Sequence, residues 1–298
     1  MERSTTRLQD EFNPNRRWIN YGTGEIKDNV RQIHTQEEME RKTKAAKYYK
    51  ENILPLPGFL QQEYGDFIHA RYLPLLQQIN NDTATAFRFI YLCTFMEYET
   101  GYLMYNKRKV DKRLLIKLLG VSANTATNII NSMLSYNLIY SDKDNYYYIN
   151  NIYCNKGSNK NIGCYHYTRI FINSIRELYN KAISSREHKL LGKFILLLPY
   201  INIYHNIICK NIKEKEIKKL ILPSSSDLDN ILGVSERHSD RTMKELLEIT
   251  VGGRPAILNI SHNQAKMYAI NPAIYYGGTN LSHLKELNGY FEAEGGLD

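Results

Sequence analysis

The tetrapeptide Leu-Gly-Val-Ser occurs twice, at 119–122 and at 232–235, and this repeat constrains the fold more than any other feature of the chain. Each copy lies between two stretches whose apolar residues recur at helical spacing. Each is followed by a strand-like segment that ends in Ile-Asn, at Asn150 and at Asn271. The pattern predicts a duplicated supersecondary unit, so the two copies are expected to fold alike.

Two blocks of matching residues support the duplication. Around the tetrapeptide the copies are offset by 113 residues, which places Asp111 over Ser224. Around the later Ile-Asn the offset is 121, which places Asn150 over Asn271. The eight-residue difference falls between the third helix and the last strand, where a loop can change length at little cost.

The first copy predicts a helix, a short strand, a helix, a tight turn, a helix and a hairpin. Its first helix is apolar and begins near Asn81, and a short strand covers 102–105. Asp111 and Ser122 are expected to cap the two helices that flank the left-handed turn at Gly120. Strands at 138–140 and 146–149 then enclose a polar loop. This is the order of a winged helix.

The second copy and the flanking segments are predicted on the same grounds. Ser235 is expected to cap the third helix of the second copy, as Ser122 does in the first. A helix over 58–79 is expected to bend or break at Pro74. The remaining expected elements are a hairpin at 18–26, a capping box at 35–38 with a helix to Lys50, a linking helix over 167–184, a helix over 188–200, a strand-like segment over 201–209, a charged helix over 210–219 and a hairpin of 256–260 with 266–270.

We therefore predict a mainly α fold with small β-hairpins, of the α+β class. It comprises two tandem winged helix-turn-helix domains joined by a helix, with a helical N-terminal extension. The predicted boundaries are an extension of hairpin and helices at 1–80, a first winged helix at 81–157, a linking segment at 158–185, a second winged helix at 186–280 and a C-terminal tail at 281–298.

The net charge of +8 is unevenly distributed along the chain. Residues 101–223 carry 20 Lys and Arg against 7 Asp and Glu, whereas residues 224–298 carry 6 against 10. A localised basic stretch favours nucleic acid, because cationic side chains that neutralise phosphates release counterions. The alternative is a solvated surface in a lysine-rich chain.

The third helix of the first copy offers a polar and nearly uncharged surface. In a helix-turn-helix this helix enters the major groove, where Asn can bond adenine and Thr can contact the thymine methyl group. Cations just upstream, and Lys143 in the wing loop, are suited to phosphate. The candidate DNA-binding residues of this copy are Lys112, Arg113, Ser122, Asn124, Thr125, Thr127, Asn128 and Lys143, with Lys107, Arg108, Lys109 and Lys117 nearby.

The corresponding surface of the second copy is charged and carries Arg237, His238, Arg241 and Lys244 as candidate DNA-binding residues. Either these side chains contact DNA, or they pair with local carboxylates while the second copy docks on protein. The second wing loop, 261–264, is not basic.

No pattern supports an enzyme or a cofactor. The sequence from His238 to Arg241 matches the HxxR fragment of tyrosine recombinases, and Tyr268, Tyr275 and Tyr276 follow it, but four residues are a weak signal. A zinc site would have to combine Cys154, Cys164 and His166 with His205 or Cys209, without the usual CxxC spacing. Four separated cysteines, including Cys93, indicate reduced thiols, as expected of a cytoplasmic protein. A DNA-binding role would in addition associate the protein with the nucleoid or a plasmid. No apolar run is long enough to span a membrane.

The organisation resembles tandem winged-helix replication initiators of plasmids and phages from low-GC Gram-positive bacteria. The block at 267–278, with Ile-Asn-Pro followed by Gly, resembles the closing strand of such proteins. The first copy departs from it, with Asn151 where the second copy has Pro272.

The resemblance implies a sequence-specific protein that binds double-stranded DNA, forms a homodimer and recruits host replication machinery. The alternative functions are a transcriptional repressor or activator that binds an operator as a dimer, and a protein-interaction scaffold.

Overall fold

The computed structural model describes residues 17–19, 26–28, 36–79, 82–157, 169–260 and 266–295. The chain divides into two compact units, residues 1–54 and residues 55–298. Its helices and small antiparallel sheets place it in the α+β class, as predicted. Among these described residues no helix is long and apolar enough to cross a membrane.

The first unit contains the predicted hairpin and helix. Strand β1 (Arg17–Ile19) pairs antiparallel with β2 (Ile26–Asp28), with Trp18 opposite Lys27. Helix α1 (Gln36–Tyr48) continues as a π-helical segment over Tyr49–Ile53. The predicted hairpin turn and Thr35 of the predicted capping box lie outside the described residues.

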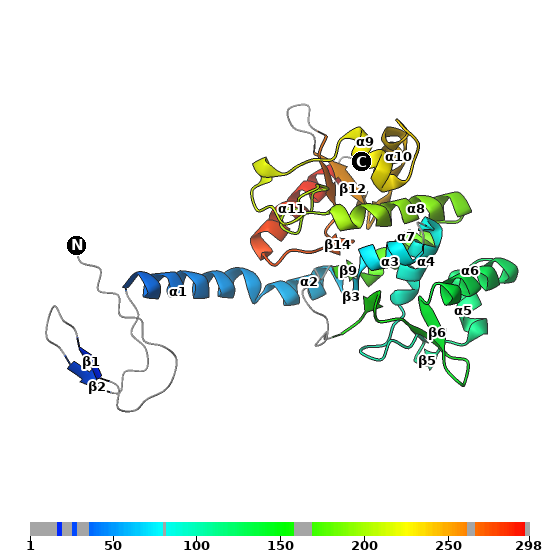
Figure 1. The fold of residues 1–298 in the computed structure, drawn as a ribbon, viewed down its shortest axis with the longest axis horizontal. Helices are drawn as coiled ribbons and strands as arrows, with labels where there is room; N and C mark the ends of the chain where they lie inside the picture. The colour runs from blue at the N-terminus through cyan, green and yellow to red at the C-terminus, as the bar shows by residue number, and fades with distance from the viewer. Residues whose placement is uncertain are drawn as a thin grey trace. The chain divides into compact units, whose positions relative to one another are not determined.

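The second unit holds both copies of the repeat, and Figure 1 shows α5 and α6 at one end of it, apart from α9 and α10. Its first half comprises α2 (Leu56–Tyr64), β3 (Phe67–Ala70), α3 (Tyr72–Gln78), α4 (Thr83–Cys93), β4 (Met104–Tyr105), β5 (Arg108–Lys109), α5 (Lys112–Leu119), α6 (Ala123–Ser135), β6 (Ile139–Ser141), β7 (Tyr147–Ile149) and β8 (Cys154–Asn155). Its second half comprises β9 (Arg169–Phe171), α7 (Ile172–Lys181), α8 (Ser185–Leu197), α9 (Ser225–Leu232), α10 (Ser239–Leu247), β10 (Thr250–Val251), β11 (Arg254–Pro255), β12 (Ile257–Asn259), β13 (Tyr268–Ile270), β14 (Tyr275–Tyr276) and α11 (Leu281–Gly295).

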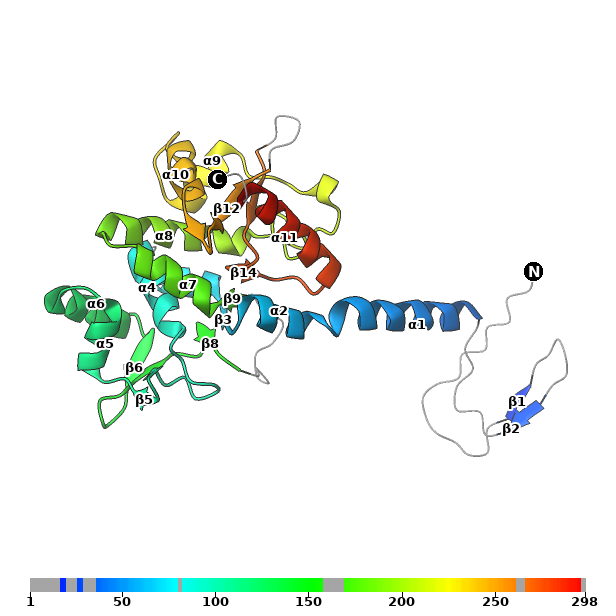
Figure 2. The same cartoon turned by 180° about the vertical axis from the view of Figure 1, so that it is seen from behind.

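A four-stranded antiparallel sheet joins the two copies, in the order β14-β9-β3-β8. Strands β3 and β9, which precede the two copies, lie at the centre of the sheet, and β8 and β14, which end them, lie at its edges. Figure 2 shows this sheet between the helix pair α5 and α6 and the helix pair α9 and α10. This is the pairing that a two-fold axis between β3 and β9 would generate. We therefore define the first repeat as residues 67–155 and the second repeat as residues 169–276.

Equivalent backbone hydrogen bonds occur in the two repeats. One pair connects the end of the entry strand (β3 or β9) to the segment just before the exit strand (β8 or β14). The other two pairs connect the segment after α4 or α8 to the hairpin β6–β7 or β12–β13. The matched pairs are Arg71 N to Tyr153 O (2.8 Å) with Phe171 N to Ile274 O (3.1 Å), Leu103 N to Tyr147 O (2.9 Å) with Ile208 N to Tyr268 O (2.9 Å), and Ile149 N to Gly101 O (2.9 Å) with Ile270 N to Asn206 O (2.9 Å). The duplication inferred from short motifs therefore extends through each repeat, from its entry strand to its exit strand.

The repeated Ile-Asn has a structural cause. The side chain of Asn150 donates to Asn137 O (2.8 Å) and accepts from Ile152 N (3.1 Å). Asn271 likewise donates to Pro255 O (2.9 Å) and accepts from Ala273 N (2.9 Å). Both asparagines are buried, so each satisfies backbone groups that would otherwise lack partners.

The eight extra residues of the second repeat divide between two places. Ile139 pairs with Ile149, and Ile257 pairs with Ile270 at the same position of the second hairpin. Five extra residues thus precede β12, where the unpredicted hairpin β10–β11 turns at Gly252 and Gly253 with positive φ. The other three lie between β12 and β13.

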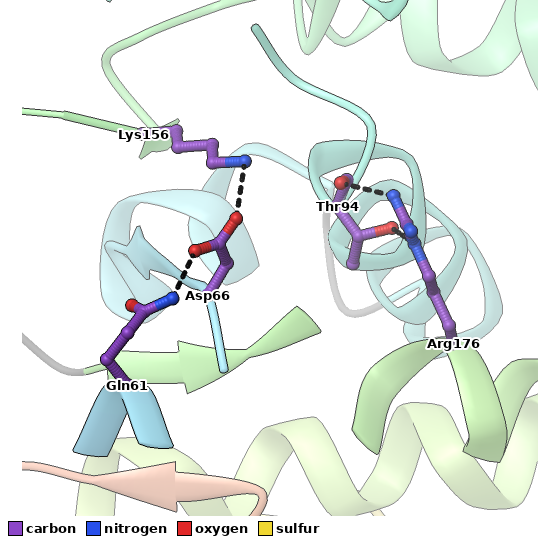
Figure 3. A network of polar contacts seen from close by, with 5 residues as sticks. All are labelled: Gln61, Asp66, Thr94, Lys156 and Arg176. Atoms are coloured by element: carbon purple, nitrogen blue, oxygen red, sulfur yellow. Dashed lines mark hydrogen bonds and ion pairs between the residues drawn. The ribbon is translucent and has the colours of Figure 1, made fainter. Parts of the chain in front are cut away.

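The repeats share one continuous cluster of buried side chains, within which α4 packs against α8. A Cβ on Gly192 of α8 would lie 2.1 Å from the carbonyl oxygen of Thr83, so only glycine permits this approach. Figure 3 shows one further connection between the repeats and one contact between segments that flank the first repeat. Arg176 of α7 donates to the carbonyl (2.7 Å) and hydroxyl (3.0 Å) of Thr94 at the end of α4. Asp66, before β3, accepts from Gln61 (2.9 Å) and Lys156 (3.5 Å), and these contacts lower its carboxyl pKa.

Two predicted helices are wrong. The segment 58–79 contains α2, β3 and α3, because Ile68 and Ala70 are buried in the central sheet, and Pro74 lies in the first turn of α3, where it is tolerated. The charged segment 210–219 forms only a 3₁₀ turn at Ile217–Lys219. There the amides of Asn202 and Asn211 bond Glu214 O and Lys219 O (2.8 and 2.9 Å), which competes with helical hydrogen bonding.

The C-terminal segment predicted as a tail contains α11. Its apolar residues Leu281, Leu284, Leu287 and Phe291 are buried. Leu281 and Leu284 pack with Leu56 and Leu60 of α2, which brings the two ends of the second unit together.

Candidate nucleic-acid interface

Helix α5 separates a buried apolar face from an exposed cationic one. Asp111 caps it by accepting from Leu114 N (2.8 Å), and Gly120 ends it with φ of 63°, as predicted. Leu115, Leu118 and Leu119 are buried. The side chains of Lys112, Arg113 and Lys117 are exposed.

Helix α6 begins at the predicted cap and presents an uncharged surface. The Ser122 hydroxyl accepts from Thr125 N (3.3 Å), while Ala126, Ile129, Ile130 and Met133 are buried. Ser122, Asn124, Thr125 and Asn128 are exposed. Thr127 is half-buried, and its hydroxyl donates to Ala123 O (2.8 Å), so it is less available to a ligand. Neither amide, of Asn124 or of Asn128, bonds another residue within the described ranges.

A pocket beside α5 gathers four cations from two elements. Arg108 and Lys109 come from β5, which follows a tight turn at Asn106 and Lys107 with positive φ at both residues. The pocket is lined by Arg108, Lys109, Asp111, Arg113, Leu114, Lys117 and Tyr146. The ammonium of Lys109 lies 3.8 Å from the ring centre of Tyr102 and 5.7 Å from that of Tyr146. These aromatic contacts hold Lys109 without neutralising it.

The loop between β6 and β7 carries Lys143 on a fixed turn. Asp142 accepts from Asp144 N (3.0 Å), Tyr146 N (2.9 Å) and the Tyr102 hydroxyl (3.1 Å). The bond from Tyr146 N is the main cause that lowers the pKa of Asp142, so this carboxylate stays ionised and keeps the loop closed. Lys143 is exposed at its tip.

Seven cations around α5, β5 and the β6–β7 loop form no ion pair with any described residue. In the described part of the chain, no ion pair involves Lys107, Arg108, Lys109, Lys112, Arg113, Lys117 or Lys143. Uncompensated positive charge beside a neutral polar helix can attract a polyanion and leave hydrogen-bonding groups available to it.

The second repeat begins its third helix differently, and the predicted cap at Ser235 is wrong. Helix α10 starts at Ser239, three residues later than a cap at Ser235 would place it, because buried Asp229 of α9 accepts from Arg237 N (2.9 Å) and Ser239 N (2.8 Å). Burial alone would raise the pKa of Asp229, but these backbone bonds lower it. Arg237, with φ of 66°, and His238 therefore lie in the turn before α10.

Charges near α10 are largely paired. Arg241 lies 3.4 Å from Glu245, which Arg186 also contacts at 2.9 Å, and Asp240 lies 2.8 Å from Lys266. Lys244 is exposed and forms no ion pair with a described residue. The side chains predicted to bind DNA in this repeat are thus split between a turn, a paired helix face and one solvated lysine.

The described residues of the recombinase-like pattern and of the candidate zinc site have other partners or are buried. His238 Nδ1 lies 2.6 Å from the Ser235 hydroxyl, whereas Arg241 pairs with Glu245. Tyr268, Tyr275 and Tyr276 are all buried. Cys93, Cys154 and Cys209 are buried free thiols, and Cys164 and His166 lie outside the described residues. Within the described ranges, no three His, Cys, Asp or Glu side chains are grouped to hold a metal.

The sequence did not point to Tyr102 and Tyr146 as parts of the site. Both belong to a tyrosine-rich chain, and nothing in their local pattern separates them from core tyrosines. Their role follows from the position of Lys109 across the hairpin.

Comparison with known proteins gives no match. No protein-family model matches the chain. No curated protein and no solved structure is significantly similar to it.

Proposed function

We propose that this chain binds double-stranded DNA through its first repeat, folded as a winged helix with α5–α6 as the helix-turn-helix and β6–β7 as the wing. The observation that carries the proposal is the cationic pocket of Arg108, Lys109, Arg113 and Lys117, free of ion pairs to described residues, beside the neutral surface of α6. A helix with short polar side chains fits the major groove, and flanking cations fit the phosphates on either side.

The two surfaces have separate tasks in this proposal. Lys112, Arg113 and the pocket cations neutralise phosphates and give affinity for any duplex. Asn124 and Asn128 bond base edges and give discrimination between sequences. Lys143 on the wing adds a backbone contact.

We assign the second repeat to assembly, with a second winged helix whose paired surface contacts protein. The mixed charges of Arg241, Glu245, Asp240 and Lys266 support this, because paired charges contribute little to attraction of DNA. A homodimer of the chain, or a complex with host replication or transcription proteins, would use this surface.

The cellular role we propose is binding to repeated sites at a plasmid or phage replication origin, which rests on the resemblance to tandem winged-helix initiators. Regulation of transcription from an operator is the alternative. Footprinting on DNA flanking the gene separates them: direct repeats beside an AT-rich tract support initiation, and a single palindrome over a promoter supports regulation.

The direct test measures binding of the purified full chain to mixed-sequence duplex by fluorescence anisotropy at several salt concentrations. Wild type is expected to lose affinity as salt rises, with a slope of about −0.9 per neutralised phosphate. Lys112→Glu with Arg113→Glu is expected to weaken binding to every sequence by on the order of tenfold or more and to flatten the slope by about two units.

The matched control places the same charge change on the second repeat, as Lys189→Glu with Lys218→Glu. Both lysines are exposed, so folding is preserved, and binding is expected to fall much less. Wild-type binding without salt dependence, or equal losses in the two double variants, would refute the proposed interface.

A further inference from the structure

Two buried tyrosines hold the turn between α5 and α6. The hydroxyl of Tyr91, on α4, donates to Leu118 O (3.2 Å). The hydroxyl of Tyr179, on α7, donates to Leu119 O (2.8 Å). These are the last carbonyls of α5, immediately before Gly120, and a helix end leaves such carbonyls without helical partners.

The two tyrosines form a buried, stacked pair. Their rings stack with centres 3.5 Å apart and an interplanar angle of 4°, and each residue is 5% exposed. Phe87 and His188 flank the ring of Tyr179, at 6.1 and 4.8 Å between ring centres. Burial raises the pKa of Tyr179 to about 12 and also raises that of Tyr91, so both hydroxyls remain protonated donors at neutral pH.

Among its described residues, the second repeat has no equivalent of this tyrosine pair. The carbonyls equivalent to those of Leu118 and Leu119 belong to Ile231 and Leu232 at the offset of 113, and no side chain in the described part of the chain donates to them. The position equivalent to Tyr179 is Ile79, counted from Arg71 and Phe171, and its side chain has no hydrogen-bond donor. Within the described residues, hydroxyl anchoring of this turn therefore occurs only in the repeat whose cations form no ion pairs.

The anchored turn lies close to the residues proposed to contact bases. Asn124 and Asn128 lie in the first two turns of α6, within about 10 Å of Ser122 at 1.5 Å per residue. Bidentate bonds to a base need distances of 2.7–3.2 Å, so a shift of roughly 1 Å at the turn would break them. Phosphate contacts through long Lys and Arg side chains tolerate such a shift.

We propose that Tyr91 and Tyr179 are positioning residues for sequence discrimination, which hold the α5–α6 turn so that α6 and the cations of α5 meet the duplex together. This inference rests on the proposed DNA-binding function. It makes α7, the helix that follows β9 in the second repeat, a structural support for base contacts made by the first repeat.

The test removes only the hydroxyls, as Tyr91→Phe with Tyr179→Phe, and uses Tyr276→Phe as the matched control. Tyr276 is also buried and donates to a backbone carbonyl, Asn280 O (2.9 Å), before α11. A duplex enriched from random sequences by wild-type protein serves as the preferred site. Affinity for that duplex and for random duplex, and amide hydrogen exchange at Gly120–Ser122 without DNA, are measured for each variant.

The double variant is expected to lose about three- to tenfold of the affinity ratio between preferred and random duplex. Its affinity for random duplex and its salt slope should match wild type, and exchange at Gly120–Ser122 should accelerate. Tyr276→Phe should change none of these. Faster exchange with an unchanged ratio would overturn the positioning role, and so would equal losses on both duplexes.

Failure of the proposed function gives a different result. In that case wild type itself shows no salt-dependent binding, and the positioning role falls with it. If wild type prefers its selected duplex over random duplex and the double variant prefers it equally, only the positioning role is refuted.

Discussion

The two repeats have the same backbone frame and different surfaces. Matched hydrogen bonds, left-handed glycines at 120 and 233, and the buried Asn150 and Asn271 recur in both. The pairing of the outward charges does not recur. The cations beside α5 lack ion pairs among described residues, while those around α10 mostly have them. The comparison separates residues that specify the fold from residues that are free to acquire a function.

The starts of the third helices differ in a way that supports this separation. Helix α6 has 13 residues and a serine cap of its own, whereas α10 has 9 and depends on Asp229 of the preceding helix. The longer helix presents its first turns to solvent. The shorter one leaves a charged turn in their place.

The largest expected effect tests the shared frame. Asn150→Ala and Asn271→Ala should each lower the free energy of unfolding by about 3 kcal/mol, because each change leaves buried backbone groups unpaired. Urea unfolding of the full chain measures this. Asn230→Ala, at an exposed position of α9, should change stability by less than about 0.5 kcal/mol. A large loss for one asparagine and none for the other would break the equivalence.

A smaller effect tests the difference between the surfaces. Asn124→Ala with Asn128→Ala should lower discrimination between preferred and random duplex by about 2 kcal/mol, roughly thirtyfold, and leave random-duplex affinity nearly unchanged. Competition binding measures both quantities.

The matched change in the second repeat is Arg241→Ala with Lys244→Ala. It should leave discrimination between preferred and random duplex within about twofold of wild type. The ion pair of Arg241 is exposed, and the surface that carries it is the one we assign to protein contacts. If it reduces discrimination as much as the asparagine variant, both third helices contact bases and the functional division is wrong.

The smallest expected effect concerns α9, the helix that ends at the turn of Gly233. Asp227 completes a capping box with Ser224 at the start of α9, and its bond with Lys210 is the main cause that lowers its pKa from 3.8 to about 2. A depressed carboxyl pKa stabilises the fold above pH 4, and this stabilisation is lost as pH falls toward 2. Asp227→Asn should therefore make Tm fall less steeply between pH 4 and 2. Identical slopes for wild type and variant would contradict the stabilising role of the ionised Asp227 carboxylate.

Local signals made much of the frame predictable. Asp111, Ser122 and Ser224 cap helices, and both glycines end them, because these roles depend on neighbours within four residues. The three predicted hairpins also formed, because the strands that pair in each of them are close in sequence. Ser235 failed as a cap because a carboxylate from the preceding helix satisfies the first N–H groups of α10.

Long-range pairing was not predictable from one sequence. Strands β3 and β9 pair across about a hundred residues, and each is too short to show a strong alternating pattern. At the candidate site, exposure of the α5 cations and α6 amides followed from helical spacing. The ion pair of Arg186 with Glu245 joins residues 59 positions apart, so its effect on the second repeat appears only in the fold.

The contact of Gly192 with Thr83 has a consequence for how the repeats can diverge. Counted from the helix N-caps Asp82 and Ser184, the counterpart of Gly192 is Ile90, so the two sides of the α4–α8 crossing are already unlike. In a homodimer each substitution is made on both sides of the axis at once, and a fit between unlike residues must occur twice. A covalently joined pair escapes that constraint and never dissociates on dilution. One half can therefore change its outer surface while the other keeps its own.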